Sequence, residues 1–96
     1  MKRKSGANSP KSEMSIRVSI VEDNRGTRES LTELLDRAPT LRCVGAHPSG
    51  EEALNQMPAE SPDVVLMDIN LPQMNGIECV SRLKVKLPRT QVLMNS

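Results

Sequence analysis

The feature that most constrains the fold is a short apolar run that ends in one acidic residue. Residues 64–67 (VVLM) show no alternation of apolar and polar side chains, which is typical of a buried strand in a parallel sheet. Asp68 follows directly, and Asn70, Pro72 and Gly76 then supply residue types that favour turns and helix starts. The segment therefore predicts a carboxylate at the carboxyl end of a strand, which is the edge where open α/β sheets bind ligands.

The rest of the chain alternates between strand and helix patterns. We predict strands at 16–21, 41–46, 64–67 and 91–94, helices at 25–37, 50–57 and 77–87, and a breaker-rich loop at 58–62. Asn24 is a predicted helix N-cap, and Ser49 with Glu52 matches the capping box that opens a helix. Strands that alternate with helices through short connections predict an α/β fold with a parallel sheet and helices on both faces.

Composition limits what this fold can be built from. The chain has 96 residues, enough for one domain, and it contains no Phe, Tyr or Trp, so the core must consist of aliphatic, Met and Cys side chains. The formal net charge of +1 gives no argument for binding nucleic acid or a membrane over the whole chain. Residues 1–15 carry four basic side chains against one acid and have no apolar period, which predicts a disordered basic tail.

Cysteine, histidine and hydropathy patterns give three further expectations. Cys43 and Cys79 lack metal-ligand spacing and are predicted to be reduced core thiols. His47, the only histidine, precedes Pro48 and is predicted to be an exposed loop residue rather than a phosphotransfer histidine. The sequence has no apolar run of about 18 residues and no secretory signal, so we expect a cytoplasmic protein with no membrane span.

Two acidic strand ends form the candidate site. Glu22 and Asp23 end the first predicted strand and Asp68 ends the third, so neighbouring parallel strands bring three carboxylates to one edge. Their repulsion is relieved either by a shared proton or by a divalent cation, and a few hard oxygen ligands favour Mg²⁺. A carboxylate oxygen at such a site can act as a phosphoryl acceptor. The alternative for Glu22 and Asp23 is that they only neutralise a helix N-terminus.

The residues around Asp68 resemble a known family. The segment D-x-x-x-P-x-M-x-G (Asp68, Pro72, Met74, Gly76), together with VEDN after the first strand, resembles receiver domains of bacterial two-component response regulators over residues 16–96. The segments VEDN-x-x-x-R-x-S-L and SGEEAL are most similar to receivers of LuxR-type (NarL/FixJ) regulators. The resemblance implies a flavodoxin-like, doubly wound parallel sheet with strand order 2-1-3-4.

The resemblance also implies a function for the acidic edge. Asp68 would be the phosphoacceptor for a sensor histidine kinase, in phosphorelay signal transduction. Glu22, Asp23 and Asp68 would hold Mg²⁺ together with the backbone carbonyl of Asn70, and Ser96 would be the hydroxyl that turns toward the phosphoryl group. Such a domain is not itself an enzyme, and this chain offers no DNA-binding segment.

The chain departs from the family pattern at its C-terminal side. The family continues with a fourth helix, a fifth strand bearing a Lys that pairs with the phosphate, and a fifth helix, so we expect a truncated receiver that ends at Ser96. Asn95 is polar where the family usually has an apolar residue. A terminal carboxylate beside the acids would hinder phosphorylation, and an uncovered sheet face with an open edge strand would promote receiver–receiver self-association and low solubility.

Two other functions are compatible with parts of this pattern. A short receiver could serve as a decoy, docking a kinase or a full-length regulator without being phosphorylated. Phosphatases of the haloacid-dehalogenase type also use an Asp after an apolar strand, but they need a second acid two residues later, where this chain has Asn70. Docking without phosphoryl transfer would identify the first, and hydrolysis of a phosphate ester would identify the second.

Overall fold

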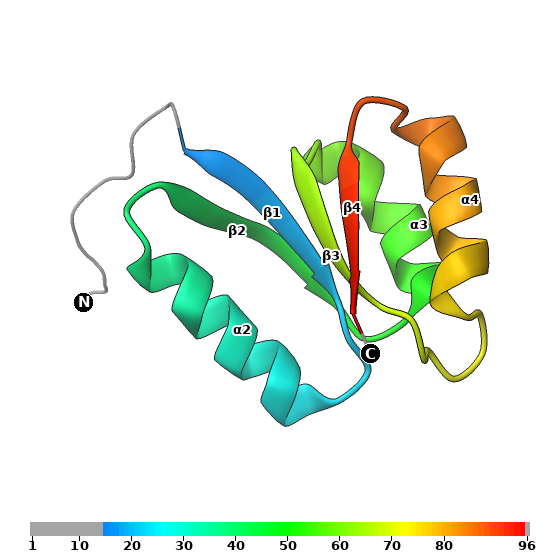
Figure 1. Ribbon diagram of the computed structural model, residues 1–96, viewed down its shortest axis with the longest axis horizontal. Helices are drawn as coiled ribbons and strands as arrows, with labels where there is room; N and C mark the ends of the chain where they lie inside the picture. The colour runs from blue at the N-terminus through cyan, green and yellow to red at the C-terminus, as the bar shows by residue number, and fades with distance from the viewer. Residues whose placement is uncertain (1–14, 96) are drawn as a thin grey trace.

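The fold is a four-stranded parallel sheet with helices on both faces (Figure 1). The computed structural model describes residues 15–95. The strands are β1 (Ile16–Val21), β2 (Leu41–His47), β3 (Val64–Asp68) and β4 (Gln91–Asn95), and the helices are α2 (Arg25–Arg37), α3 (Gly50–Glu60) and α4 (Gly76–Lys86). The order across the sheet is β2-β1-β3-β4 and every pairing is parallel. The predicted flavodoxin-like architecture is confirmed. The predicted tail at 1–15 lies, apart from Ser15, outside the described residues.

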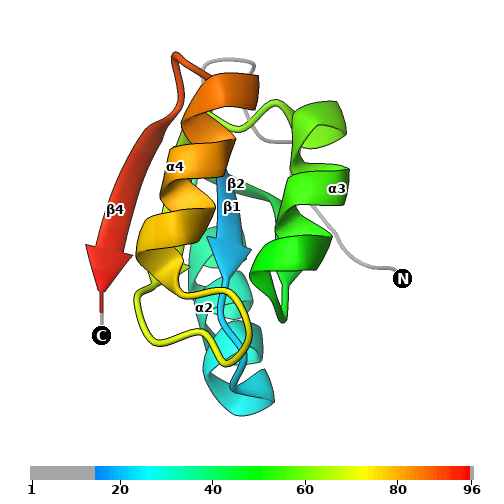
Figure 2. The same ribbon diagram turned by 90° about the vertical axis from the view of Figure 1, so that its right-hand side faces the viewer.

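The two faces of the sheet are covered unequally. Helix α2 lies on one face, whereas α3 and α4 lie side by side on the other (Figures 1 and 2). The larger core cluster lies between the sheet and α3 and α4; its members are Val21, Ala53, Met57, Val65, Met67, Leu71, Met74, Cys79 and Leu83. The smaller cluster lies beneath α2 and contains Val18, Ile20 and Leu35. The core is therefore aliphatic and sulfur-containing, as the absence of aromatic residues requires.

The central strand β3 reflects this asymmetry. Val65 and Met67 have no exposed surface because they point toward α3 and α4. Val64 and Leu66 point toward the face that carries α2 and are only partly buried. The apolar run thus alternates in burial, although the sequence alone shows no alternation.

Side-chain caps begin all three helices. Asn24 accepts a hydrogen bond from the Thr27 amide, Ser49 from Glu52 and Asn75 from Glu78. Each cap satisfies an amide that has no partner inside its helix. The predicted caps at Asn24 and Ser49 are confirmed, and α2 has the predicted bounds.

Helix α3 is longer than predicted, so the loop expected at 58–62 was wrong in its first half. The helix continues through Pro58 to Glu60 and ends at Ser61, whose φ of 49° lies in the left-handed region. A proline in the last turn removes one amide donor, and the Ser61 amide still closes the helix on the Met57 carbonyl at 3.1 Å.

His47 corrects a second prediction. It is the last residue of β2 and only 2% exposed, not an exposed loop residue. The sequence placed it beyond the strand because Pro48 follows, but the imidazole is buried against α3 by partners described below.

Some apolar residues at core spacing on the helices are exposed. Leu34 of α2 and Ile77 of α4 occur at core spacing but are 61% and 63% exposed. In each helix the residues that reach the core form a narrower stripe than the sequence indicates.

The remaining features are the thiols, the outer strand and helix length. Cys43 is half-buried, Cys79 is buried and both are free; burial raises the pKa of both thiols, that of Cys79 to about 11. Strand β4 lies at the edge of the sheet and leaves Leu93 and Met94 exposed. No helix among residues 15–95 is long and apolar enough to span a bilayer.

Candidate metal centre

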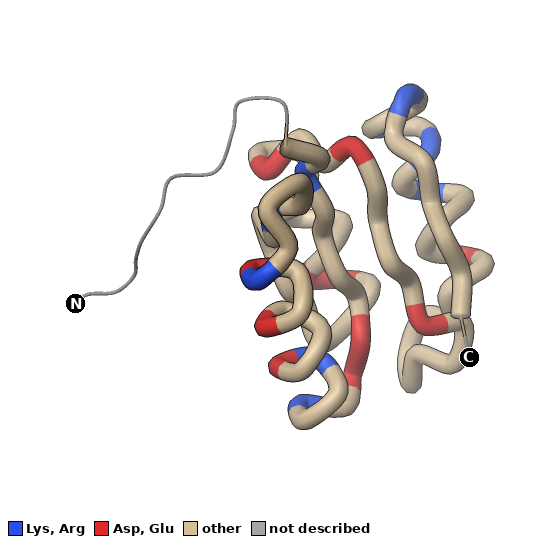
Figure 3. The backbone as a smooth tube through the Cα atoms, turned by 60° about the vertical axis from the view of Figure 1, so that its left-hand side comes forward, with Lys and Arg blue, Asp and Glu red and all other residues tan. Residues whose placement is uncertain are grey.

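Three carboxylates meet where β1 and β3 end. The two strands are paired in parallel with Val21 opposite Met67, so the residues that follow them, Glu22 and Asp68, come from adjacent positions. Carboxylate oxygens of Glu22, Asp23 and Asp68 all lie within 4.8 Å of one another. Figure 3 colours acidic positions red along the backbone, and red segments lie near the lower ends of neighbouring strands. The predicted convergence of the two acidic strand ends is therefore present.

Glu22 extends the β1 ladder by one residue. Its amide donates to the His47 carbonyl at 2.9 Å, and its carboxylate accepts from the Asn24 amide at 3.0 Å. Burial raises the pKa of Glu22 above its ordinary value, and the negative charges of Asp68 and Asp23 raise it further. Burial is the larger cause of this shift, and the contribution of the two neighbouring acids reflects the concentration of negative charge at the site.

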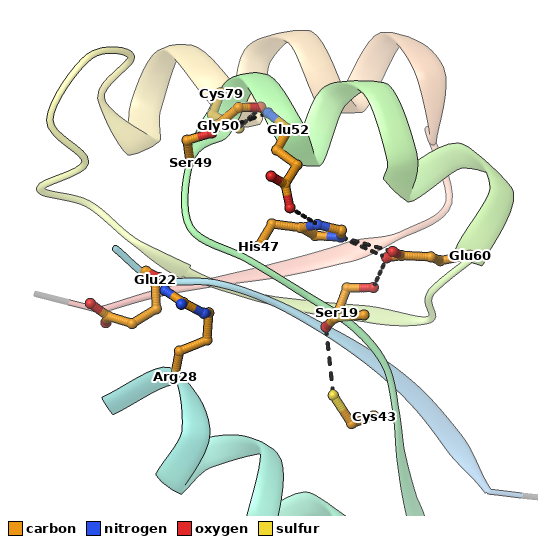
Figure 4. A network of polar contacts seen from close by, with 11 residues as sticks. Ser19, Glu22, Arg28, Cys43, His47, Ser49, Gly50, Glu52, Glu60 and Cys79 are labelled. Carbon is orange, nitrogen blue, oxygen red and sulfur yellow. Dashed lines mark hydrogen bonds and ion pairs between the residues drawn. The ribbon is translucent and has the colours of Figure 1, made fainter. Parts of the chain in front are cut away.

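The guanidinium group of Arg28 holds the backbone around Glu22 and Asp23 through carbonyl oxygens rather than through the carboxylates. Arg28 of α2 donates from Nη1 to the Glu22 carbonyl oxygen at 2.8 Å (Figure 4). The same atom donates to the Asp23 carbonyl oxygen at 3.3 Å. Within residues 15–95, the salt bridges do not involve Glu22, Asp23 or Asp68. The N-cap of α2 is Asn24 and its first turn has no acid; Glu22 and Asp23 directly precede this cap, and the Glu22 carboxylate accepts from the Asn24 amide.

Asp68 begins a loop that is anchored at several points. Asp68 Oδ1 accepts a hydrogen bond from the Asn70 amide at 2.8 Å. The Ile69 amide donates to the Asn95 carbonyl at 2.8 Å, and the Gly76 amide donates to the Ile69 carbonyl at 3.1 Å. Leu71 and Met74 are buried in the larger core cluster, whereas Pro72 is exposed. The loop thus places Asp68 at the acidic edge by backbone bonds and two apolar anchors.

The predicted site residues fare differently. Glu22, Asp23 and Asp68 are brought together. The exposed Asn70 lies next to them, because its backbone amide donates a hydrogen bond to the Asp68 carboxylate. Ser96 lies outside the described residues. The sequence reasoning missed the supporting roles of Arg28 and His47. Arg28 occupies a fixed place in the VEDN-x-x-x-R pattern, which is the signal that could have identified it.

The arrangement suits a hard divalent cation and a nucleophilic oxygen. Carboxylate oxygens without a paired cation are the ligands that Mg²⁺ prefers, and a small set of them leaves coordination positions for water or phosphate oxygen. A carboxylate at such an edge can also attack phosphorus.

Comparison with known proteins gives a consistent result. A family model described as response regulator receiver domain matches residues 18–96. A curated relative, protein-glutamate methylesterase/protein-glutamine glutaminase 1 of Syntrophus aciditrophicus, is 40% identical over 81 residues, which are 84% of this chain and 23% of that protein. The chain therefore spans less than a quarter of the length of that relative.

Solved structures share the fold. The response regulator domain of Thermotoga maritima CheB has a TM-score of 0.78 and 38% identity, covering 83% of this chain and 59% of that chain. The signal receiver domain of the putative response regulator NarL from Mycobacterium tuberculosis has a TM-score of 0.74 and 30% identity, covering 88% and 66%. The similarity thus extends to proteins of more than one regulator class.

Proposed function

This chain belongs to the response regulator receiver domain family, and from that premise we propose that Asp68 accepts a phosphoryl group from a sensor histidine kinase. Membership implies phosphorelay signalling in two-component systems. The observation that carries the residue assignment is the grouping of the Glu22, Asp23 and Asp68 carboxylates within 4.8 Å at the carboxyl ends of β1 and β3.

The proposed reaction moves one phosphoryl group between two side chains. An Asp68 carboxylate oxygen attacks the phosphorus of a phosphohistidine, the new P–O bond forms as the P–N bond breaks, and the released imidazole regains a proton from solvent. Asp68 suits this role because it lies at the end of β3, is half-buried, and keeps one oxygen hydrogen-bonded to the Asn70 amide. That bond orients the carboxylate.

Glu22, Asp23, Asp68 and the Asn70 carbonyl are the proposed Mg²⁺ ligands. The residues fit a cation because three carboxylates share one edge, without a salt bridge inside the described part of the chain, and the pKa of Glu22 is raised by burial and by its acidic neighbours. A bound Mg²⁺ would supply charge neutralisation for the incoming phosphoryl group. Glu22 and Asp23 would hold it, and Arg28 would keep their backbone in place.

Two finer assignments extend this proposal. Ser96 is proposed as the hydroxyl that turns toward the phosphoryl group, a role resting on its position after β4 in the sequence.

A LuxR-type regulator is proposed as the parent class of this receiver, supported by the VEDN-x-x-x-R-x-S-L segment and the 30% identity to the NarL receiver. A methylesterase-type receiver is the competing class, supported by the 40% identity to the Syntrophus relative. We also propose a cytoplasmic location.

Intact-mass analysis tests the proposal directly. The purified chain is incubated with Mg²⁺ and acetyl phosphate, beside Asp68→Asn and the matched variant Asp63→Asn. Asp63 lies just before the opposite end of β3 and accepts a hydrogen bond from the Arg17 amide, so it controls for a charge change on the same strand. We expect one added phosphoryl group in the wild-type chain and in Asp63→Asn, and none in Asp68→Asn. Equal labelling of Asp68→Asn, or no labelling of a folded wild-type chain, would overturn the assignment.

A further inference from the structure

A chain of polar contacts, buried at the sheet and partly exposed at the helix, links the sheet to α3 on the face opposite α2 (Figure 4). Its side chains are Ser19 of β1, His47 of β2, and Glu52 and Glu60 of α3. Ser19 has no exposed surface and the His47 side chain is 3% exposed. Buried polar groups are costly unless they are paired, so these contacts help to hold α3 on the sheet beside the apolar contacts of the larger core cluster.

His47 is held from both sides of its ring. Nδ1 lies 3.3 Å from Glu52 Oε2, and Nε2 lies 2.8 Å from Glu60 Oε2. Figure 4 shows the imidazole between the two carboxylates. Since carboxylates accept hydrogen bonds, this geometry is fully satisfied when both ring nitrogens donate. Two fixed partners on opposite sides leave the ring little freedom to rotate or shift.

Glu60 is in turn fixed by the sheet beneath it. Ser19 Oγ donates to Glu60 Oε1 at 2.8 Å, and Arg17 donates to the Glu60 carbonyl and to the Ser61 carbonyl. A methyl group on Gly45 would lie 2.2 Å from the Glu60 carboxylate oxygens, so the carboxylate occupies space that only glycine leaves open. The end of α3 is thereby attached to both β1 and β2.

The main chain of His47 connects this network to the acidic edge. Its carbonyl accepts the Glu22 amide at 2.9 Å, and this bond extends the pairing of β1 with β2 to the residue that carries the first carboxylate. The side chain of His47 is therefore held by α3 while its backbone holds Glu22. A displacement of the His47 backbone would move Glu22 relative to Asp68.

We propose that His47, through its contacts with Glu52 and Glu60, is a positioning residue for Glu22, and the metal-binding part of this inference rests on the function proposed above. Residues that hold a metal ligand in position typically contribute about 10-fold or more to metal affinity. His47 does so through its carbonyl, without contacting a ligand's carboxylate. Loss of its imidazole frees the end of β2 and loosens Glu22, while the strand centres keep their pairing.

The test compares His47→Ala with the wild-type chain by two measurements. Amide hydrogen exchange of Glu22, followed by NMR without metal and referenced to Ile20, reports on the His47–Glu22 bond alone. Calorimetric titration with Mg²⁺ reports on the site. We expect the Glu22 amide of His47→Ala to exchange faster relative to Ile20, and the Mg²⁺ dissociation constant to rise about 10-fold. Glu60→Gln, which keeps an acceptor for the ring, should leave both values close to those of the wild-type chain.

The remaining variants keep the test decisive. Arg82→Ala, which breaks the exposed Glu78–Arg82 pair on α4, should change neither measurement. If His47→Ala does not fold, Glu52→Ala replaces it, because that side chain is 40% exposed and its loss removes the acceptor beside Nδ1; the same direction is expected with a smaller factor. Unchanged relative exchange of Glu22 in the folded variants would overturn the inference. A wild-type chain that does not bind Mg²⁺ would overturn the proposed metal site, and the exchange data would still decide the role of His47.

Discussion

Gly76 approaches Asp68 so closely that a methyl group on its Cα would lie 2.7 Å from the Asp68 carbonyl oxygen. The same methyl group would lie 2.8 Å from the Ile69 Cα. Both contacts are with backbone, which cannot rotate away as a side chain can. No glycine among residues 15–95 has a positive φ, so close approach and not backbone freedom explains the glycine that ends the D-x-x-x-P-x-M-x-G segment.

Replacement of Gly76 should therefore disturb the fold and the acidic edge together. We expect Gly76→Ala to lower the free energy of unfolding by about 1–3 kcal/mol, the usual cost of inserting a methyl group into close-packed surroundings. Urea unfolding followed by far-ultraviolet circular dichroism measures it. The control is Gly26→Ala in α2, where the nearest atom to a methyl group is Asn24 Oδ1 at 3.4 Å, and stability there should be unchanged or higher. Equal stability of both variants would contradict the explanation.

The raised pKa of Glu22 predicts how stability depends on pH without metal. A carboxyl group that binds its proton more tightly in the folded state contributes stability at low pH that is lost as the pH rises from the ordinary value of 4.5 through the folded-state pKa. Glu22→Gln keeps an acceptor for the Asn24 amide and removes the charge. We expect it to raise stability at pH 7 by about 0.5 kcal/mol, a value discounted for solvent screening.

Thermal melts at a series of pH values provide the measurement. The difference between Glu22→Gln and the wild-type chain should vanish well below pH 4.5, where Glu22 is protonated in both the folded and unfolded states. If Mg²⁺ binds at this edge, its addition should stabilise the wild-type chain more than the variant. A variant that is less stable than the wild-type chain at pH 7 without metal would show that the Glu22 charge is favourable, contrary to this prediction.

Self-association through the outer strand remains a prediction. β4 lies at the sheet edge and Leu93 is 56% exposed, a combination of unpaired backbone and apolar surface that favours contact between copies. We expect Leu93→Lys to weaken concentration-dependent self-association in sedimentation velocity experiments. Val85→Lys is the matched control, because Val85 is 84% exposed but lies on α4. Equal effects of the two substitutions would mean that general charge, and not the β4 surface, governs association.

The fold was predictable from the sequence because its signals are local. Asn24 and Ser49 mark helix starts by bonds within three residues, and apolar runs between turn residues mark the strands. The proximity of the Glu22, Asp23 and Asp68 carboxylates was also predictable, because parallel strands place their carboxyl ends at one edge of the sheet.

The features that were missed depend on contacts between distant segments. The burial of His47 requires carboxylates 5 and 13 residues away on α3, one of which lies beyond the proline that was expected to end the helix. Leu34 and Ile77 have the spacing of core residues, but the position of each helix against the sheet decides which part of its stripe is covered. Arg28 acts on backbone carbonyls, whose direction no residue pattern specifies.

Because the core is built partly from methionine, methionine methyl groups lie near the acidic edge and can serve as spectroscopic labels. Met67 precedes Asp68, Met74 anchors the following loop, and the Met94 methyl carbon lies 2.9 Å from the position that a Gly76 methyl group would occupy. With six methionines in the chain, selective carbon-13 labelling of their methyl groups would give a sparse spectrum in which three signals surround the candidate site. Cation binding and phosphoryl transfer could then be followed without introducing a fluorophore.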